Sequence, residues 1–593
     1  MVDALSKISP STEEVDVVVI GAGPVGCASA LQLGRAGRST ALFERRSGLS
    51  RHPKAGGIHA RTMEIFRQWG LAHDIRAVGR GLLQPGAVPT AFTWLTRLNG
   101  VELGRIDFGS QADRELWATY SPEGPCFCGQ DLYEPILFEA LAKYPSVRAQ
   151  FGKRATISAL GDEGVEVEVS DEETGRIEKH VRARYLIAAD GVRSPTRHAL
   201  GVGESGFGAF GDSVNVQFRA DLERHRAGRQ YGLFWIVNPD TQGALSWRRQ
   251  ADRWSYNFEA APGEDPQSYT EDRCRDIIRR AVGDLSVEIE ILSILHWKHD
   301  QAVTDKWRVG RVFFVGDSAH RFPPHGGFGM NSGVQDSANL IWKLDLVLSS
   351  AAADSLLDTY QEERKPVAEF NGEQCLENTR RMEETGWLLH DTAHLAAIEE
   401  QTPRGHSVRD RIAAAIPRQR EQFYSQGQQF GTIYRSAAVL LDGTEPELST
   451  VSLYRPTAHP GARAPHLWLR DRDGRELSTI DLFYDGFVLL AGPDGSQWLR
   501  ATAEAAAERT IGATAYLIGA GGDYVERSGE RSFTEAYSVE SDGAVLVRPD
   551  GHVAFRSRRL PGDPTRALVR ALRHLLAGAS ATEEASSTET APV

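Results

Sequence analysis

The pattern of hydrophobic positions near the amino terminus predicts a parallel βαβ unit. An uninterrupted apolar run, Val15 to Ile20, is typical of a strand that is buried on both faces of a sheet. A glycine-rich turn at residues 21–26 follows directly, then a helical pattern from about Pro24 to Ala36 that ends at Gly37, and then a second apolar strand, Ser39 to Phe43. Strand, turn, helix and strand in this order predict two neighbouring parallel strands joined by a helix.

The glycine-rich turn has the spacing of a dinucleotide-binding loop. In G-x-G-x-x-G the first glycine permits the tight turn, the second lets a pyrophosphate approach the backbone, and the third lets the helix pack on the strand. Glu44 ends the second strand, where a carboxylate can accept hydrogen bonds from ribose hydroxyls. The residues predicted to hold an adenine dinucleotide here are Gly21, Ala22, Gly23, Pro24, Val25, Gly26, Glu44 and Arg45. This pattern alone leaves NAD and FAD both open.

Two later apolar strands end in an aspartate beside a glycine. Asp190-Gly191 ends the strand in ARYLIAADGVRSPTRHALGV, and Gly316-Asp317 ends the strand in GRVFFVGDSAH. Together, and in this order after the glycine-rich turn, the three motifs resemble those of the class A flavoprotein monooxygenases, the aromatic hydroxylase family typified by p-hydroxybenzoate hydroxylase and phenol hydroxylase. The resemblance covers most of the chain and favours FAD as the dinucleotide.

Further segments carry the same resemblance. HARTMEIFRQWGL, GQDLYEPILFEAL and LLDTYQEERKP are similar to segments of that family. QFGTIYRSAAVLLDGTEPE and YRPTAHPGARAPHLWL are similar to its longer subgroup, which includes 2,4-dichlorophenol 6-monooxygenase and many antibiotic-tailoring hydroxylases. The resemblance therefore implies a hydroxylase of a phenolic or aromatic substrate, ortho or para to a hydroxyl group, that uses FAD, NADPH or NADH, and O2 through a flavin C4a-hydroperoxide.

The resemblance also implies roles for single residues. Glu44 would hold the AMP ribose and Asp317 the ribityl chain, while Asp190 and Gly191 would lie where the pyrophosphate and NAD(P)H approach. Carboxylates suit the ribose and ribityl positions because they accept hydrogen bonds from hydroxyls in pairs. The other residues expected at the cofactor are Arg61, Gln130, Gly316, Gly327, Gly329, Met330 and Asn331.

A proline corner and a glycine-rich loop follow Asp317. Pro323 and Pro324 have a fixed φ and no N–H to donate, and the resemblance implies that a proline carbonyl faces the reacting edge of the flavin. A helix is expected to begin near Asn331 and to direct its positive end at the flavin. The candidate catalytic residues are Pro323, Pro324, His52, His59 and Tyr231. His320 and His325 have no metal-ligand spacing, so they are expected to fix the loop by hydrogen bonds.

In the last third of the chain a new succession of predicted strands and a helix begins. STIDLFYDGFVLLAG reads as a strand, Gln497 to Arg509 as an amphipathic helix, and GAVLVRPDGHVAFR as a hairpin with Asp550-Gly551 as a two-residue turn. This order resembles the thioredoxin-like domain that ends phenol hydroxylase and its relatives. Every cysteine precedes this domain, so we expect a structural or assembly role and no dithiol chemistry.

The predicted fold class is α/β. It combines a Rossmann-like FAD-binding domain of the glutathione reductase type, an inserted antiparallel-sheet substrate domain and a carboxyl-terminal thioredoxin-like domain. The predicted boundaries are 1–14 for an amino-terminal extension, 15–205 and 295–400 for the two parts of the FAD-binding domain, 206–294 for the substrate-binding sheet, 401–455 for a helical linker, 456–577 for the thioredoxin-like domain and 578–593 for a disordered tail.

Composition removes several classes of function. The 593-residue chain has a net charge of -13, which argues against a nucleic acid partner. Its five cysteines show no zinc-like spacing, so no metal site is expected. The first residues lack the apolar core of a signal peptide and no apolar run is long enough to span a membrane, which favours a cytoplasmic protein. We expect a homo-oligomer that binds a small aromatic substrate.

Several alternatives stay open. A flavin-dependent halogenase shares the glycine-rich start, but its usual Trp-x-Trp-x-Ile-Pro signature is not found. An NAD-linked dehydrogenase would leave the Asp190 and Asp317 motifs without a purpose. A non-catalytic FAD-binding or drug-sequestering protein is the third alternative. Within the hydroxylases, the substrate is either a simple phenol or a larger polyketide or pyridinol-type antibiotic precursor.

Overall fold

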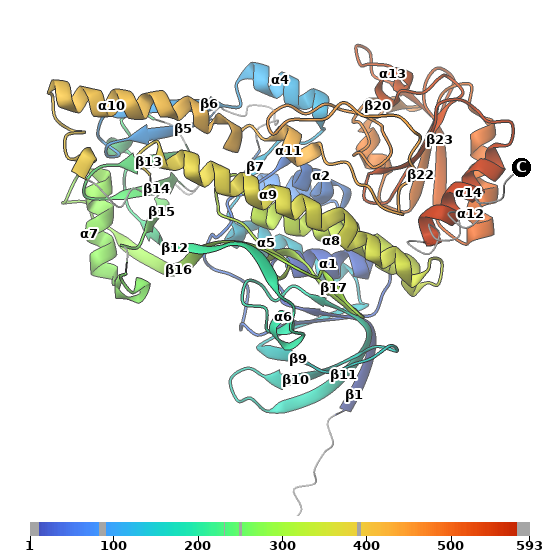
Figure 1. Ribbon diagram of the computed structural model, residues 1–593, viewed down its shortest axis with the longest axis horizontal. Helices are drawn as coiled ribbons and strands as arrows, with labels where there is room; N and C mark the ends of the chain where they lie inside the picture. The colour runs from blue at the N-terminus through green and yellow to red at the C-terminus, as the bar shows by residue number, and fades with distance from the viewer. Residues whose placement is uncertain are drawn as a thin grey trace, which may run out of the picture.

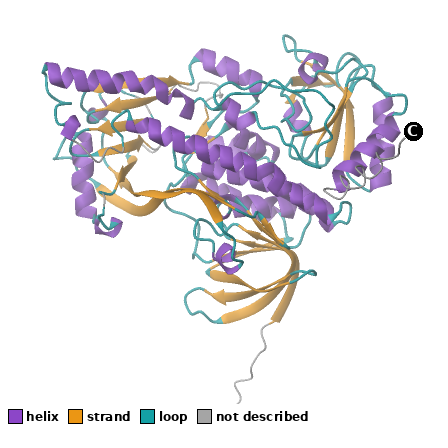
Figure 2. Ribbon diagram, in the orientation of Figure 1, coloured by secondary structure: helices purple, strands orange, loops and turns teal. Residues whose placement is uncertain are grey.

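The computed structural model describes residues 11–81, 90–229, 232–247, 252–261, 263–387 and 393–577. The predicted tail and the catalytic candidate Tyr231 lie outside these residues. Figure 1 shows a mixed α/β architecture in which the two long helices α8 (Phe328–Leu348) and α9 (Thr359–Glu383) run across the middle of the molecule. The strands gather in separate sheets around these helices (Figure 2).

The predicted βαβ unit is the centre of the first sheet. β1 (Ser11–Ile20) pairs in parallel with β2 (Thr40–Glu44), and α1 (Pro24–Arg35) connects them. On its other side β1 pairs in parallel with β11 (Ile177–Ala188), which pairs in parallel with β18 (Val312–Phe314). Because parallel strands all end at one edge of a sheet, the motifs that follow β1, β2, β11 and β18 meet there. β1 starts at Ser11, so it includes part of the predicted amino-terminal extension.

The second sheet has eight strands in the order β19-β16-β12-β15-β14-β13-β5-β6. Its bounds are β19 (His320–Arg321), β16 (Glu290–Thr304), β12 (Glu204–Arg219), β15 (Arg253–Glu259), β14 (Gln242–Trp247), β13 (Leu233–Val237), β5 (Thr90–Leu95) and β6 (Glu102–Phe108). All neighbours are antiparallel except β13 and β5. The sheet therefore takes two strands from residues 90–108, which lie far from the predicted span of 206–294.

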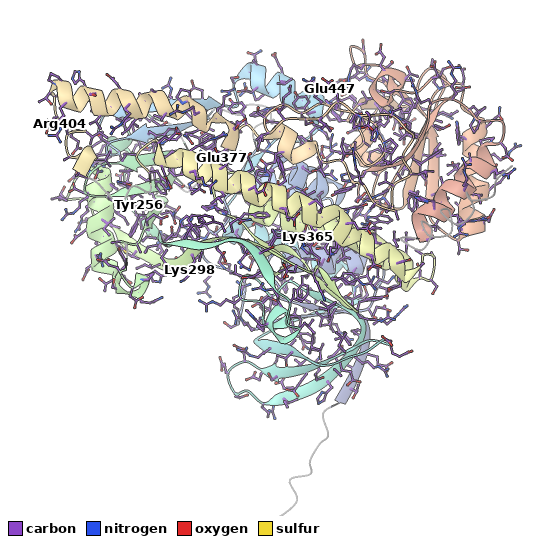
Figure 3. All side chains as sticks on the ribbon, viewed as in Figure 1. Tyr256, Lys298, Lys365, Glu377, Arg404 and Glu447 are labelled. Atoms are coloured by element: carbon purple, nitrogen blue, oxygen red, sulfur yellow. The ribbon has the colours of Figure 1, made fainter. Side chains whose placement is uncertain are left out.

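One face of this sheet is closed by a helix. α7 (Glu271–Val282) packs on Trp254, Tyr256 and Phe258 of β15 and on Phe218 of β12. Tyr256 lies on the α7 side of the sheet (Figure 3). Because side chains alternate along a strand, the residues between these buried ones face the opposite way.

The carboxyl-terminal domain has the topology predicted for a thioredoxin-like fold. β22 (Phe487–Ala491) pairs in parallel with β23 (Ala513–Leu517) and antiparallel with β25 (Ala544–Val547), which pairs with β26 (Val553–Ser557). The helices are α12 (Gln497–Arg509), with the predicted bounds, and α14 (Pro564–Ala577). The predicted two-residue turn at Asp550-Gly551 is wrong. Residues 548–552 join the strands, with Gly551 N donating to Arg548 O at 2.9 Å.

Candidate active site

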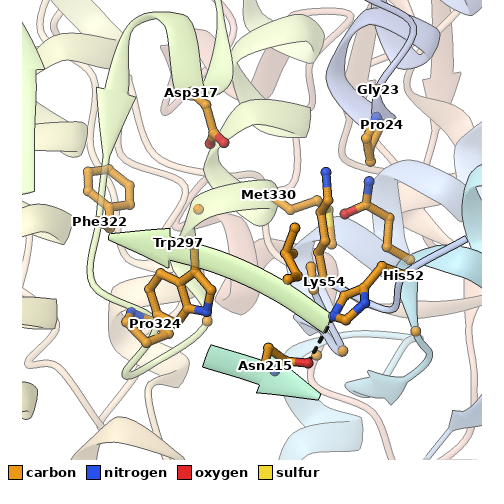
Figure 4. Close-up of a pocket in the computed structure, with 18 of the residues that line it drawn as sticks. Gly23, Pro24, His52, Lys54, Asn215, Trp297, Asp317, Phe322, Pro324 and Met330 are labelled. Atoms are coloured by element: carbon orange, nitrogen blue, oxygen red, sulfur yellow. Dashed lines mark hydrogen bonds between the residues drawn. The ribbon is translucent and has the colours of Figure 1, made fainter. Parts of the chain in front are cut away.

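A cavity of about 2380 Å³ lies between the carboxyl edge of the parallel sheet and the open face of the second sheet. Pockets for one drug-sized ligand usually measure about 300–1,000 Å³, so this cavity has room for more than one. Figure 4 shows Asp317, Asn215 and, from a single loop, His52 and Lys54 around this cavity.

The glycine-rich turn forms one end of the cavity as the sequence predicts. A Cβ on Gly21, whose φ is +101°, would lie 2.3 Å from the Ala189 carbonyl oxygen, and one on Gly26 would lie 1.8 Å from the Gly21 oxygen. Gly23 differs, because a Cβ there would meet no protein atom within 4 Å and Gly23 lines the cavity. The first and third glycines thus serve packing, and the second leaves the backbone open to a ligand.

Glu44 lies at the end of β2 and is nearly fully buried. Its carboxylate accepts hydrogen bonds from Ala22 N at 2.9 Å and from Arg46 N and Nε, each at 3.0 Å. Burial alone would raise the pKa of Glu44, but the hydrogen bonds and charge of Arg46 lower it below its ordinary value. Glu44 is therefore an ionised acceptor at the cavity, whereas Arg45 is exposed at the rim.

Two aspartates at the ends of the other strands have carboxylate oxygens for which no hydrogen bond to a described residue is found. Asp190 accepts from Thr196 N at 3.1 Å through Oδ2, while its buried Oδ1 has no partner among the described residues. Asp317 is exposed to the cavity, and the protein around it raises the pKa of its carboxyl group by desolvation, an effect that His320, Lys54 and Arg321 reduce. Free carboxylate oxygens at these positions fit the hydroxyl groups of a dinucleotide.

Lys54 is a cavity residue that sequence reasoning missed. It follows the βαβ unit in the loop HPKAGG and forms no ion pair with the described residues, although Asp317 and Glu134 act on it electrostatically. Lys54 is exposed to the cavity, where desolvation by the surrounding protein, and then the charge of Arg46, lower its pKa. The loop after Glu44 also carries Arg45, Arg46 and Arg51, so its sequence did not single out Lys54, whose charge suits a phosphate ligand.

The proline corner and its loop are fixed by a hydrogen-bond network. Pro324 O accepts from Gly327 N at 3.0 Å, so this carbonyl is committed to the turn. His59 Nε2 donates to Gly326 O at 2.9 Å, and Asn331 Nδ2 donates to Gly327 O at 2.7 Å. Gly327, at φ +73°, is the residue before α8, so the helix begins at Phe328 and not near Asn331 as expected. The left-handed glycine allows the earlier start.

The histidines hold neighbouring segments in place by hydrogen bonds. Burial lowers the pKa of His59 to about 4, so its ring is neutral while it holds the loop. Both ring nitrogens of His52 are engaged, Nδ1 with Ser293 Oγ at 2.8 Å and Nε2 with Asn215 Oδ1 at 2.9 Å. These contacts favour positioning roles over proton abstraction. His320 bonds to Asp336 at 2.8 Å and His325 to Thr379 at 2.9 Å, as expected of loop-fixing residues.

Some residues expected at the cofactor lie behind the cavity wall. The guanidinium of Arg61 donates to Glu64 at 2.9 Å and to Asp550 O at 2.7 Å, so it joins the two domains. Gly316 N donates to Asp336 at 3.1 Å. Gln130 lines the cavity, but its amide nitrogen donates to Glu134. Ala22, Gly26, Gly316, Asn331 and Arg61 do not line the cavity, whereas Pro24, Val25, Gly191, Gly329, Met330 and Pro323 do.

The second sheet supplies the other wall. Its open face carries polar residues at the centre and aromatic ones towards both sides, none of which the sequence singled out as a contact. The set comprises Asn215, Gln217, Ser255 and Asn257 with Phe92, Phe108, Trp235 and Trp297. Among the described residues no cluster of three or more His, Cys, Asp or Glu is placed to hold a metal ion.

Comparison with known proteins identifies this arrangement. Residues 14–374 match a family described as FAD binding domain, and residues 457–579 match one described as aromatic-ring hydroxylase, C-terminal. The chain belongs to the FAD-dependent aromatic-ring hydroxylases. It is 35% identical over 599 residues to tetracenomycin A2 monooxygenase-dioxygenase of Streptomyces glaucescens, covering 96% of this chain and 98% of that protein. It is 32% identical over 590 residues to 2,4-dichlorophenol 6-monooxygenase of Cupriavidus pinatubonensis, covering 95% and 97%.

Solved hydroxylase structures have the same fold. The flavin-dependent monooxygenase PieE, in complex with FAD and substrate, matches with a TM-score of 0.86 and 32% identity over 95% of this chain and 99% of that one. Aklavinone-11 hydroxylase with FAD and aklavinone matches with a TM-score of 0.80 and 32% identity over the same shares. The hydroxylase family, the fold class and the cofactor FAD, with NAD(P)H and O2, are therefore confirmed. No helix among the described residues is long and apolar enough to cross a membrane.

Proposed function

We propose that this hydroxylase acts on a phenol that is part of a fused-ring system. The observation that carries the proposal is the cavity of about 2380 Å³, which continues past the nucleotide motifs to the open face of the second sheet. The aromatic side chains Phe92, Phe108 and Trp235 on that wall suit flat rings. Tetracenomycin A2 monooxygenase-dioxygenase and aklavinone-11 hydroxylase, both similar over nearly their whole length, support a polycyclic substrate.

The chain's residues fit FAD at the other end of the cavity. Glu44 would accept from the AMP ribose, Asp317 from the ribityl hydroxyls, and Asp190 from groups near the pyrophosphate. Gly23 leaves room for the pyrophosphate and Lys54 supplies a positive charge for it. The chemistry supplied by bound FAD is reduction by NAD(P)H and activation of O2 for transfer of one oxygen atom to an electron-rich ring carbon.

The protein's own contribution is a rigid and dry reaction site. The proline corner cannot donate hydrogen bonds, and its glycine loop is held by His59 and Asn331. The first turn of α8, with Phe328, Gly329 and Met330, lines the cavity, and the positive end of the helix favours negative charge on a neighbouring group. Such a wall would help to keep water away from bound FAD and the substrate ring.

A single-ring phenol is the second candidate substrate. The similarity to 2,4-dichlorophenol 6-monooxygenase extends over 95% of the chain at 32% identity, which favours it. We further propose that the protein is cytoplasmic, where NAD(P)H is available, and forms a homo-oligomer. Light scattering on the purified protein would measure its mass against the 65.2 kDa of one chain.

The test is a panel of single-ring and fused-ring phenols offered to the FAD-loaded enzyme with NADH or NADPH. A fused-ring substrate should accelerate NAD(P)H oxidation and gain the mass of one oxygen atom, with little H2O2 released. If only single-ring phenols gain oxygen, the second candidate is correct. If no phenol accelerates NAD(P)H oxidation or gains oxygen, the hydroxylase proposal for this chain fails.

A further inference from the structure

Asn257 occupies the middle of the cavity wall formed by the second sheet. It lies on β15 between Tyr256 and Phe258, which are both buried against the α7 side. Asn257 therefore faces the cavity, where its side chain is partly exposed. Its cross-strand partner on β12 is Asn215.

One neighbour fixes which way the Asn257 amide points. Trp297 Nε1 donates to Asn257 Oδ1 at 3.2 Å. An indole nitrogen can only donate a hydrogen bond, so the atom that faces it must be the amide oxygen. Exchanging the oxygen and nitrogen of Asn257 would set two donors against each other. The orientation of the Asn257 amide is therefore set by the donor-only indole of Trp297.

The orientation of Asn257 also fixes the orientation of Asn215 on β12 and the tautomer of His52 in the loop after β2. Asn215 Nδ2 donates to Asn257 Oδ1 at 3.3 Å, so the Asn215 oxygen faces His52. The Nε2 of His52, 2.9 Å away, must then carry the proton. Its Nδ1 meets Ser293 Oγ at 2.8 Å. A donor-only indole thus sets the orientation of two amides and the tautomer of one histidine.

In this hydrogen-bond network the Nδ2 group of Asn257 has no acceptor among the described residues. The oxygen of Asn257 accepts two hydrogen bonds, while no described residue supplies an acceptor for its Nδ2. If the network served only to stabilise the sheet, neither N–H group of this partly buried amide would have a partner among the described residues. The geometry instead presents an oriented donor to whatever occupies the cavity.

We propose that Asn257 Nδ2 donates a hydrogen bond to a keto or quinone carbonyl on the substrate, and that Trp297 orients it for this task. The inference rests on the proposed function, which it deepens: the fused-ring phenol carries an acceptor oxygen on the edge that faces β15. A site built to hydrogen-bond an oxygen rejects an analogue that lacks it, because the buried donor is then left unpaired. His52 acts in this scheme as a positioning residue.

The experiment compares two probes of the same ring number on the oxidised, FAD-loaded enzyme. 2-Hydroxyanthraquinone carries the carbonyl oxygens and 2-hydroxyanthracene lacks them. Titration of each, followed by the change in the flavin absorption spectrum, gives its dissociation constant without turnover. The wild-type enzyme should bind the quinone about tenfold more tightly, the worth of one well-placed hydrogen bond.

Three variants test whether the Nδ2 donor of Asn257, and not the rest of the cavity wall, causes the preference for the quinone. Asn257→Asp keeps the acceptor for Trp297 and Asn215 but replaces the donor with an oxygen, so the preference for the quinone should disappear. Trp297→Phe removes the orienting indole N–H, so the ratio of the two dissociation constants should move towards one, whatever the change in overall ring affinity. Asn99→Asp makes the same chemical change at an exposed residue that does not line the cavity, and should keep the preference.

Specific outcomes overturn the inference. Equal affinity of wild-type enzyme for the two probes, binding of neither, or a quinone preference that survives in Asn257→Asp would each contradict it. Should Asn257→Asp fail to fold, Asn257→Ser, which is too short to reach, carries the same expectation. An enzyme that shows the preference but hydroxylates no phenol contradicts the proposed function alone. One that hydroxylates fused rings without the preference contradicts this inference alone.

Discussion

Arg548, in the carboxyl-terminal domain, forms a two-pronged ion pair with Glu363 of α9, with N to O distances of 2.6 and 2.8 Å. Both side chains are fully buried, and Lys343 Nζ also donates to Glu363 at 2.8 Å. Burial acts to raise the pKa of Glu363, but the charges of Arg548 and Lys343 hold it well below its ordinary value. The carboxyl-terminal domain is thus joined to the FAD-binding domain by charges buried away from water.

Breaking this ion pair should destabilise the protein strongly. Arg548→Met leaves Glu363 and Asp550 buried with fewer partners, and losing one member of a buried pair costs about 3–5 kcal/mol. Urea unfolding monitored in both domains measures the loss. The control is Arg472→Met, which removes the exposed ion pair with Asp523 and should cost at most about 1 kcal/mol. Equal losses of unfolding free energy in the two variants would show that the buried ion pair stabilises the protein no more than the exposed one.

Asp317 should be required for FAD affinity. Asp317→Asn keeps the shape of the side chain but removes the charge, and a hydrogen bond to a charged acceptor is worth about 1.5–3 kcal/mol. FAD should therefore bind about 10-fold to 100-fold more weakly, as measured by flavin fluorescence on adding apoprotein. Asp473→Asn, at an exposed residue of the carboxyl-terminal domain, should leave FAD affinity unchanged. Stoichiometric FAD in purified Asp317→Asn would argue against the ribityl role.

The nucleotide end of the site was predictable because its signals are local. The glycine turn, Glu44 and Asp317 each end a recognisable apolar strand, and parallel pairing alone brings those ends together. The substrate end depends on register between distant segments. Nothing near Asn257 in the sequence indicates that β12 places Asn215, and β16 places Trp297, at its amide.

One local prediction failed at a place where distant segments contact the turn. Asp550-Gly551 has the composition of a two-residue turn, but the loop is longer, and its Arg548 side chain and Asp550 carbonyl bond to Glu363 and Arg61. Arg61 was assigned to the cofactor from resemblance, and its partner is that same carbonyl. The length of a turn that contacts another domain cannot be predicted from the turn's own residues.

Acid should destabilise the folded protein through its buried histidines. Burial lowers the pKa of His59 from 6.5 to about 4, so below pH 6.5 the unfolded chain binds the proton more readily than the folded one. Each pKa unit is worth about 1.4 kcal/mol, so His59 alone should cost about 3 kcal/mol between pH 6.5 and pH 4. Thermal midpoints across this range should fall less steeply in His59→Gln. The exposed His73→Gln should retain the wild-type slope.

Alanine at the second and third glycines of the turn should separate cofactor binding from folding. A Cβ at position 26 meets the Gly21 oxygen at 1.8 Å, so Gly26→Ala should lower the thermal midpoint and the yield of folded protein. A Cβ at position 23 meets no protein atom within 4 Å, so Gly23→Ala should fold with a near wild-type midpoint as apoprotein. The same methyl group would occupy the path of the pyrophosphate, so FAD affinity should fall at least about tenfold. If Gly23→Ala binds FAD normally, the pyrophosphate does not approach the chain at this glycine.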